Sequence, residues 1–302
     1  MTLEQLRIFV AVALREHVTL GARDLNLTQS ATSAAIAALE SRHATKLFDR
    51  VGRRIVLTEA GRVFLAEAKA VLARANAAEM VLSDLGELKR GRLQIAASQT
   101  IANYWLPSHI HAFRSRFPGV EVQLTIGNTT TVAADVRDGN VDLGFVEGDT
   151  READVTIERV ADDELILVVP LDHPWAETSP QPGALANESW ILREAGSGTR
   201  AIFEDALPAL GLARDALNVV LELPSNEAVR SMVEAGAGVT VMSRLVVQQA
   251  IRAGVLAEVA LPIAKRGFYL LRHRERYVSR AATEFAQGLT LELTGTAGRR
   301  TR

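Results

Sequence analysis

The sequence has no cysteine among its 302 residues. This absence excludes a disulfide framework, cysteine-ligated zinc, an iron–sulfur cluster and a thiol nucleophile. No apolar run approaches the roughly 20 residues that are needed to span a bilayer, so we expect no membrane partner. Residues 1–4 lead directly into an amphipathic helix, without the charged and apolar regions of a signal peptide. We therefore expect a cytoplasmic protein.

Signatures of catalysis are missing as well. The sequence has no Gly-x-Ser-x-Gly elbow, no phosphate-binding P-loop and no dinucleotide-binding Gly-x-Gly-x-x-Gly. A helix would place His109 and His111 about 200° apart around its axis, which is too divergent for a metal pair. No nucleophile stands beside a base. We expect no enzyme, no catalytic residue, no metal site and no cofactor.

The charge is unevenly distributed along the chain. The formal net charge is −2, but residues 1–57 hold eight basic and five acidic side chains, which makes this segment +3 and the remainder −5. A modestly basic head on an acidic body suits a protein that touches DNA with one end only.

Residues 19–61 are the most informative stretch. Two short apolar-periodic segments meet at 26–28, where Thr28 is a good helix N-cap, and Thr19 is the expected cap of the first segment. The second segment directs Ala31, Ile36 and Leu39 toward a core and Gln29, Ser30, Thr32 and Ser33 outward. This layout is typical of a helix-turn-helix, whose second helix offers its first residues to base edges in the major groove.

A short basic hairpin, or wing, should follow this helix. Arg50, Arg53 and Arg54 surround Gly52 and precede an apolar strand at 55–57. The helix itself has no basic side chain between Gln29 and Ser41, so it has no arginine to bind guanine. We expect base contacts from polar side chains, with alanine and Thr32 methyl groups against thymine methyls, and Arg53 or Arg54 in an A·T-rich minor groove. The predicted DNA-binding residues are Thr28, Gln29, Ser30, Thr32, Ser33, Arg50, Arg53 and Arg54. The alternative is a solvated, alanine-rich helix with basic residues merely nearby.

This stretch resembles the DNA-binding domain of the LysR-type transcriptional regulators. The matching positions are Thr28–Ala31, Ser33, Ile36, Leu39–Glu40, Leu47–Phe48, Arg50 and Leu57–Gly61. The resemblance implies a winged helix-turn-helix domain over residues 1–58, dominated by helices, which binds double-stranded DNA. It also implies a linker helix that dimerises, over 59–90, and an effector-binding domain over 91–302.

The periodicity of residues 58–88 supports one long helix. Apolar side chains alternate at spacings of four and three, as in the seam of a coiled coil. The expected seam consists of Phe64, Ala68, Val71, Ala75, Ala78, Leu82 and Leu85. We expect this helix to pair two copies of the chain; the alternative is a helix packed on its own domain.

Beyond residue 92, strands alternate with helices at the spacing of a parallel α/β sheet. The last helix is expected over 279–289. The order resembles the effector domain of the same family, a two-lobed fold like type II periplasmic binding proteins. The resemblance places lobe one at 91–161 and 266–302 and lobe two at 162–265.

Ligands of open α/β sheets bind beyond the carboxyl ends of strands, where helix N-termini direct their N–H groups inward. Segments 98–100, 127–129, 196–199 and 225–226 each join a strand to a helix with hydroxyl or amide residues, and Arg193 or Arg200 is a candidate charge partner. The predicted effector-binding residues are Ser98, Gln99, Thr100, Asn128, Thr129, Arg193, Ser197, Gly198 and Thr199. Hydroxyls, N–H groups and an arginine favour a small anion.

Two sequence segments indicate a particular branch of the family. Residues 191–200 and 236–239 look most like the branch of the family that serves sulfur assimilation and carbon fixation. That likeness implies a sulfur oxyanion or a phosphorylated metabolite as the effector. As partners we expect a dyad-symmetric promoter site, further copies of the chain as a dimer of dimers (a homotetramer), and RNA polymerase as a further candidate. The alternative is a two-lobed binding protein or enzyme whose N-terminal domain serves only assembly.

Overall fold

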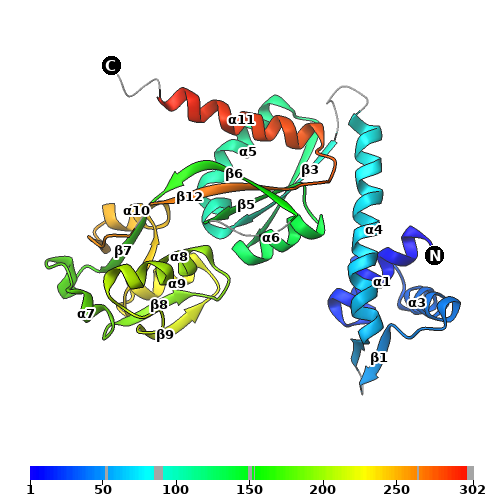
Figure 1. Cartoon of the computed structure of the whole chain (residues 1–302), viewed down its shortest axis with the longest axis horizontal. Helices are drawn as coiled ribbons and strands as arrows, with labels where there is room; N and C mark the ends of the chain where they lie inside the picture. The colour runs from blue at the N-terminus through cyan, green and yellow to red at the C-terminus, as the bar shows by residue number, and fades with distance from the viewer. Residues whose placement is uncertain (52–53, 85–90, 149–151, 153, 264, 298–302) are drawn as a thin grey trace. The chain divides into compact units, whose positions relative to one another are not determined.

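The computed structural model describes residues 1–302 except 52–53, 85–90, 149–151, 153, 264 and 298–302. The chain forms two compact units, Met1–Leu85 and Gly86–Arg302, which are described one at a time (Figure 1). Within the described residues, no helix combines the length and the apolar composition that crossing a membrane requires.

The first unit begins with three short helices, α1 (Leu3–Arg15), α2 (Val18–Asp24) and α3 (Gln29–His43). Thr2 starts α1 with a reciprocal capping box to Gln5. His17 caps α2, because its side chain accepts from the backbone N–H of Leu20 at 3.5 Å. The expectation that Thr19 caps this helix is therefore wrong: the helix begins at Val18, one residue before Thr19.

A hairpin and a long helix complete this unit: β1 (Phe48–Val51), β2 (Arg54–Leu57) and α4 (Glu59–Asp84). The core between them is apolar, with Phe9 fully buried and its ring centroid 4.9 Å from that of Phe64. Residues from α1, α3, the hairpin and α4 share this core, among them Leu6, Leu39, Leu47, Leu57 and Ala68. The wing and the start of α4 are thus fixed to the helix-turn-helix by burial of apolar area.

The long helix α4 uses its apolar side chains differently from the expected seam. Phe64 and Ala68 pack into the core of their own unit, so these two seam positions are not available to a second copy. Val71 and Ala78 of the expected seam are exposed, and Val63 and Val81 are further large apolar side chains exposed on the described part of the helix. The side chains of Leu82 and Leu85 lie outside the described residues.

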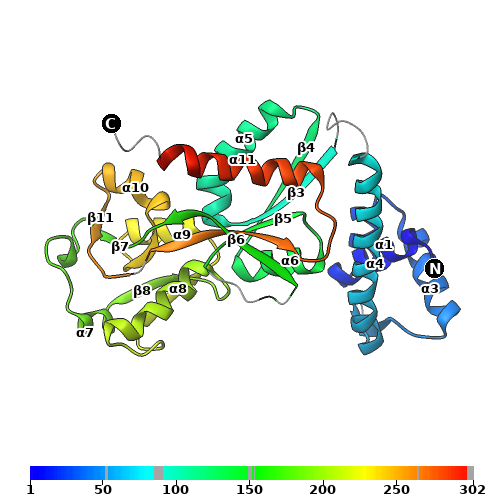
Figure 2. The ribbon, with the colours of Figure 1, turned by 45° about the horizontal axis from the view of Figure 1, so that its top comes forward.

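Lobe one of the second unit is a five-stranded sheet in the order β4-β3-β5-β12-β6. Its strands are β3 (Gly91–Ser98), β4 (Val120–Gly127), β5 (Leu143–Glu147), β6 (Val155–Asp163) and β12 (Arg266–His273). The first three are parallel, whereas β12 runs antiparallel to both β5 and β6. In Figures 1 and 2, α5 (Leu106–Arg116) and α11 (Arg280–Ala297) cover one face and α6 (Thr129–Asp138) covers the other.

Lobe two contains two smaller sheets. β7 (Leu165–Pro170) lies between β10 (Thr240–Ser243) and β11 (Leu256–Val259), antiparallel to both, and β8 (Ser189–Arg193) pairs in parallel with β9 (Asn218–Leu223). The helices of this lobe are η2 (Pro174–Ala176), α7 (Pro182–Leu185), α8 (Gly198–Ala206), η3 (Leu207–Leu210), α9 (Asn226–Glu234) and α10 (Arg244–Arg252). Trp190 and Phe203 are fully buried in its core.

The predicted fold class, a helix-turn-helix head with a long helix and a two-lobed α/β part, is confirmed. The expected parallel pairing is found for β3 with β4 and β5 and for β8 with β9, whereas the other strand pairs of the two lobes are antiparallel. Strand β6, which the sequence did not predict, leads almost directly into β7 of the other lobe, and β12 returns beside it. Because two strands cross between the lobes in opposite directions, each lobe acquires antiparallel neighbours. The last helix also extends beyond the expected 289, to Ala297.

Candidate functional site

The start of α3 presents polar side chains at the surface. Thr28 caps the helix, since its Oγ1 accepts from the backbone N–H of Ala31 at 3.2 Å. Gln29 and Ser30 are exposed and Ser33 is half-buried, with Gln29 Nε2 donating to Ser33 Oγ at 3.4 Å. These side chains can exchange their contacts for base edges, because they are held only by weak, local hydrogen bonds.

Thr32 departs from the prediction. Its side chain was expected to face outward, but Thr32 is 0% exposed and its Oγ1 has no hydrogen-bond partner among the described residues. Thr32, Ile36 and Leu39 form one buried stripe at spacings of four and three, which leaves Ala31 exposed. The predicted burial of Ile36 and Leu39 is confirmed, but Thr32 takes the buried position expected for Ala31, and a buried Thr32 cannot reach a base.

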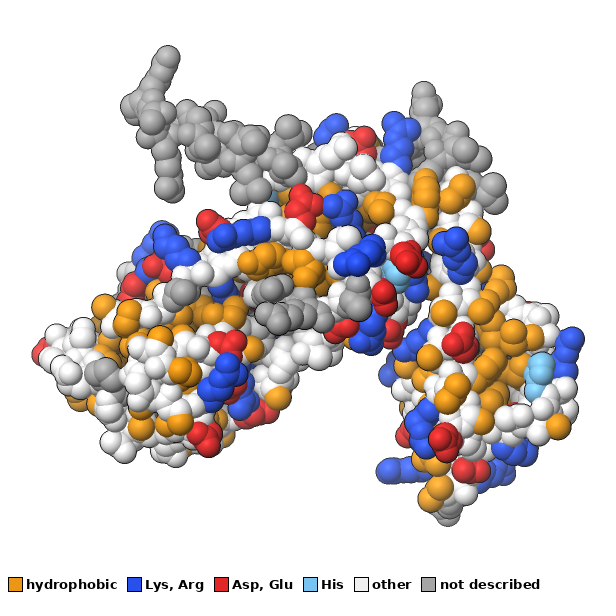
Figure 3. All heavy atoms as spheres, viewed as in Figure 1, with side chains coloured by type: hydrophobic (Ala, Val, Ile, Leu, Met, Phe, Trp, Pro, Cys, Tyr) orange, Lys and Arg blue, Asp and Glu red, His pale blue; other side chains and the backbone are white. Residues whose placement is uncertain are grey.

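The hairpin carries the basic side chains nearest to this helix in sequence. Arg50 and Arg54 are exposed on β1 and β2, while Arg53 lies outside the described residues. Lysine and arginine side chains gather on the end of the unit that carries this hairpin (Figure 3). Exposed basic groups next to a polar helix N-terminus suit contact with phosphates and grooves of DNA.

A buried carboxylate fixes α3 to the hairpin. Glu40 accepts from the backbone N–H groups of Leu47 at 2.8 Å and Phe48 at 3.2 Å, and from Lys46 Nζ at 2.7 Å. Burial alone would raise the pKa of the Glu40 carboxyl, but these three hydrogen bonds outweigh it and bring the pKa below its ordinary value. Glu40 thus positions the wing relative to the recognition helix.

In the second unit, the predicted residues lie where the two lobes meet. Gln99, directly after β3, donates from Nε2 to the Pro224 carbonyl at 2.7 Å and accepts from the Asn226 N–H at 2.9 Å. Asn226 Nδ2 also donates to Thr100 Oγ1 at 3.1 Å. The carboxyl end of β3 is therefore tied to the N-terminus of α9 in the other lobe. Ser98 is 3% exposed, and its Oγ has no partner among the described residues.

Arg193 reaches the same junction, but its charge is already compensated. Its Nε and Nη2 donate to the two oxygens of Glu194, at 2.7 and 2.9 Å, and its Nη1 donates to Asn226 Oδ1 at 2.5 Å. Asn128 of lobe one donates from Nδ2 to Glu194 Oε1 at 3.1 Å. The other candidate cation, Arg200, pairs with Glu204 and Glu222. Neither arginine is a free anion receptor.

A second buried network lies at the strands that cross between the lobes. Arg266, at the start of β12, donates from Nε to Asp163 Oδ2 at 2.7 Å and from Nη1 to Thr199 Oγ1 at 2.9 Å. Glu147 is buried 3.9 Å from Arg266 Nη2, and Thr129 Oγ1 donates to its carbonyl at 3.3 Å. This network brings Thr129 and Thr199, from the two lobes, close to the strands that connect the lobes.

The segment before α8 is closely packed against lobe one. A side chain at Gly198 would place its Cβ 2.5 Å from Thr129 Oγ1 and 2.7 Å from the Glu147 carbonyl oxygen, so only glycine allows this approach. Ser197 is buried and precedes the helix without a side-chain capping bond. Gly198 and Thr199 therefore border lobe one at the N-terminus of α8.

The sequence-based prediction missed the acidic and basic side chains of these networks. Glu147, Asp163, Glu194 and Arg266 were not named. Glu147 is the last residue of β5 and Glu194 directly follows β8, which is a usable signal. The pairing of Asp163 with Arg266, in contrast, joins residues 103 positions apart. A single turn of π-helix, η1 (Ile101–Trp105), was missed too; such turns often mark functional sites. Its Tyr104 hydroxyl donates to Glu227 Oε1 across the lobes at 3.0 Å.

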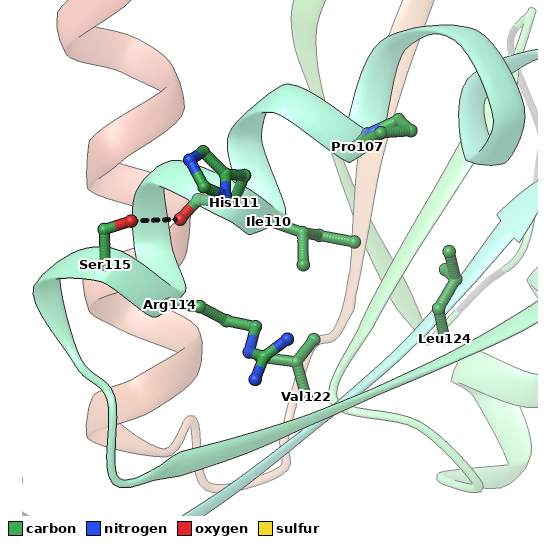
Figure 4. A pocket seen from close by; sticks show the side chains of 7 residues that line it. All are labelled: Pro107, Ile110, His111, Arg114, Ser115, Val122 and Leu124. Atoms are coloured by element: carbon green, nitrogen blue, oxygen red, sulfur yellow. Dashed lines mark hydrogen bonds between the residues drawn. The ribbon is translucent and has the colours of Figure 1, made fainter.

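A separate groove lies between α5 and β4, and none of its lining residues belongs to these networks. Figure 4 shows Ile110, Arg114 and Val122 on its walls, with Ser115 Oγ donating to the His111 carbonyl at 2.9 Å. It gathers no predicted site residue. Among the residues that the structure describes, no group of three or more histidine, aspartate or glutamate side chains is arranged to hold a metal ion.

Comparison with known proteins covers both units. Residues 3–62 match the family model described as bacterial regulatory helix-turn-helix protein, lysR family, and residues 86–293 match the LysR substrate binding domain. The chain is 35% identical over 291 residues to the HTH-type transcriptional regulator YeiE of Escherichia coli (strain K12), covering 94% of this chain and 96% of that protein.

Two further matches extend the comparison. The chain is 33% identical over 292 residues to a probable RuBisCO transcriptional regulator of Cyanophora paradoxa, covering 95% of this chain and 90% of that protein. The solved regulatory domain of Synechocystis PCC6803 CcmR in complex with 2-PG aligns with a TM-score of 0.62 at 28% identity, covering 67% of this chain and 97% of that one.

Proposed function

The chain belongs to the LysR family of bacterial transcriptional regulators, and from this membership we propose that it binds a dyad-symmetric promoter site as an oligomer and responds to a small anion held between the lobes of its effector domain. We propose residues 1–58 as the DNA-binding domain, 59–90 as the pairing helix and 91–302 as the effector domain. RNA polymerase is the proposed partner through which binding changes transcription.

For the DNA site, α3 reads the major groove and the wing reads the backbone or the minor groove. The exposed Gln29 amide suits adenine, and the hydroxyls of Ser30 and Ser33 suit either partner of a base pair. Arg50 and Arg54 supply phosphate or minor-groove contacts, and Arg53 is proposed from the sequence alone. Thr28 orders the helix start as its cap, and Thr32 is withdrawn as a base contact.

A gel shift on the promoter region of the protein's own gene tests this assignment. Sequence-dependent, salt-sensitive binding is expected, and Gln29→Ala should weaken binding to the specific site about tenfold, as expected for loss of a bidentate base contact. The matched control is Gln249→Ala, at an exposed position on α10 of the effector domain. Equal binding to specific and scrambled DNA would contradict the proposal.

For the effector, the observation that carries the proposal is the Ser98 hydroxyl, which is buried at the lobe junction without a partner among the described residues. A buried polar group of this kind calls for a ligand or water partner. Thr100, Asn128, Thr129, Ser197 and Thr199 lie around the same junction on three chain segments, which supports a ligand enclosed by both lobes. Gln99, Arg193 and Gly198 shape the site through the contacts given above.

The class of effector is proposed from the site and the relatives together. Hydroxyls, amides and the α8 N-terminus favour an anion. The similarity to a RuBisCO regulator and to a domain solved with 2-PG supports a phosphorylated metabolite, with a sulfur oxyanion as the other member of the proposed class. Binding must favour one lobe arrangement over another to change the spacing of the DNA-binding heads.

Thermal unfolding of the full chain with phosphate, phosphorylated sugars, sulfite, thiosulfate and small carboxylates tests the effector site. Specific binding raises the unfolding midpoint, because it adds about 2.7 kcal/mol to the free energy of unfolding when the ligand concentration is a hundredfold above its dissociation constant. Ser98→Ala should abolish that shift at little cost in stability, because its Oγ has no described hydrogen bond to lose. Ser108→Ala, on α5, is the control. A shift that survives Ser98→Ala would exclude Ser98 from the site.

Oligomer formation is proposed through α4. Val63, Val71 and Val81 are the large apolar side chains exposed on its described part, and Val63 and Val81 lie about five turns apart on one line of the helix. Burying them against a second copy removes this apolar area from water. Pairing of effector domains with one another would extend the dimer to the expected tetramer.

A further inference from the structure

We infer that Glu194 occupies the anion-binding side of the lobe junction as an internal counter-ion, which the effector must displace, and that this residue sets the selectivity of the site for strong oxyanions. The inference rests on the proposed anion site and deepens it. It concerns the regulation of that site by a residue of this chain.

The geometry around Glu194 is that of a bound carboxylate ligand. Its oxygens accept from Arg193 Nε and Nη2 and from Asn128 Nδ2, so both lobes donate to it. Paired N–H···O bonds from one guanidinium are the arrangement by which arginine recognises carboxylate and phosphate groups. Burial would raise the pKa of the Glu194 carboxyl, but Arg193 and Asn128 outweigh burial and lower it, so the counter-ion is charged near neutral pH.

Displacement is feasible for Glu194 and not for Asp163 or Glu147. The Glu194 side chain is 22% exposed, whereas that of its partner Arg193 is 5% exposed. Rotation can therefore carry the carboxylate into water while the guanidinium stays in place. Asp163 is held by Arg266 and Ser243 with almost no exposure, and Glu147 is buried as well. Arg193 is thus the cation that an incoming anion can take over.

Competition with a bidentate carboxylate has a consequence for selectivity. A weakly accepting monoanion gains too little from Arg193 and Asn128 to replace Glu194. A phosphate or sulfur oxyanion offers more acceptor oxygens and more charge, and it can also accept from the Ser98 hydroxyl. Glu194 therefore weakens the binding of every anion at this site, and it favours the anions with the most acceptor oxygens.

The experiment is a titration of the full-length protein with inorganic phosphate, in which the thermal unfolding midpoint is measured at each phosphate concentration. Glu194→Gln keeps the side-chain length and removes the competing charge, so its dissociation constant for phosphate should fall about tenfold below that of the unaltered protein. Glu222→Gln is the matched control: it removes a carboxylate from Arg200 in the same lobe and should leave phosphate binding unchanged. Glu194→Asp, which retains the charge, should remain close to the unaltered protein.

The outcomes separate this inference from the proposed function. Equal phosphate affinity in Glu194→Gln and the unaltered protein, or an equal gain in Glu222→Gln, would overturn the role of Glu194 and leave the anion site standing. Absence of phosphate binding in every variant, including a folded Glu194→Gln, would overturn both. If Glu194→Gln fails to fold, a tenfold gain in Glu194→Ser would support the inference and an unchanged affinity would overturn it.

Discussion

At the scale of single residues, Thr32 stands in a position that an apolar side chain would fill better. Its hydroxyl is buried without a partner among the described residues, and an unsatisfied buried hydroxyl costs free energy. Thr32→Val should raise the free energy of unfolding by about 1 kcal/mol, measured by urea denaturation. DNA affinity should stay within about twofold, since a buried side chain makes no base contact.

The control for this substitution is Thr45→Val, on an exposed hydroxyl that bonds locally to the His43 carbonyl. That change should bring no stabilisation. A large loss of DNA affinity in a well-folded Thr32→Val protein would instead restore Thr32 as a base contact and contradict the helix phase described here.

Glu40 gives the DNA-binding unit a defined pH dependence. Its pKa is lowered in the folded chain, so its contribution to stability is present above the unfolded value of about 4.3 and is lost as the pH falls through the folded pKa. Glu40→Ala should cost about 1–3 kcal/mol at pH 7, because the N–H groups of Leu47 and Phe48 lose their acceptor. The gap between the two proteins should narrow below about pH 4.

The measurement is urea denaturation across about pH 3–8, a range that begins about one unit below the unfolded glutamate pKa of about 4.3 and extends well above it. Glu67→Ala on α4 is the control, because Glu67 is exposed. A gap of constant size over the whole range would mean that Glu40 stabilises the fold through packing rather than through its charge.

At the scale of elements, the sequence predicts where α3 begins but does not assign every side chain on its buried face. The start of α3 follows from Thr28 as a capping residue, and the helix-turn-helix follows from the break at 26–28. Ile36 and Leu39 were correctly assigned to the buried face of α3, but Ala31 was assigned there in place of Thr32. Alanine occupies 31, 34, 35, 37 and 38 and is compatible with either face. In α4, the regular apolar spacing did not reveal that Phe64 and Ala68 pack into the core of their own unit.

The pairing role of α4 can be tested with one charge on each of two faces. Val71→Asp places a carboxylate among the exposed valines and should convert the oligomer toward monomers in sedimentation, with at least a tenfold loss of affinity for a dyad site because only paired heads bind two half-sites. The control Asn76→Asp adds the same charge at an exposed position about 140° around the helix from Val71. If both variants dissociate equally, the two copies do not pair through the helix face that carries Val71.

At the scale of the whole molecule, the lobe junction shows what a sequence leaves hidden. The strand-to-helix turns at 98–100, 127–129 and 196–199 could be predicted, because parallel strand ends converge at one edge. Their actual partners could not: Gln99 bonds to Asn226 and Arg266 to Asp163 across more than a hundred residues. Charge compensation of Arg193 by its neighbour Glu194 likewise appears only once both side chains are placed.

The last prediction connects the wing to the assembly. Each phosphate contact adds about −0.9 to the slope of log binding constant against log salt concentration. If two heads bind one site, Arg54→Ala removes two equivalent contacts and should make the slope shallower by about 1.8. Filter binding of the full-length protein to its promoter over a range of salt concentrations measures this, with the exposed Arg116→Ala of the effector domain as the control. A change of about 0.9 would mean that one head engages, and an unchanged slope would mean that the wing arginine does not touch the backbone. Because the slope counts heads, a single substitution reports both the DNA contact and the oligomer that makes it.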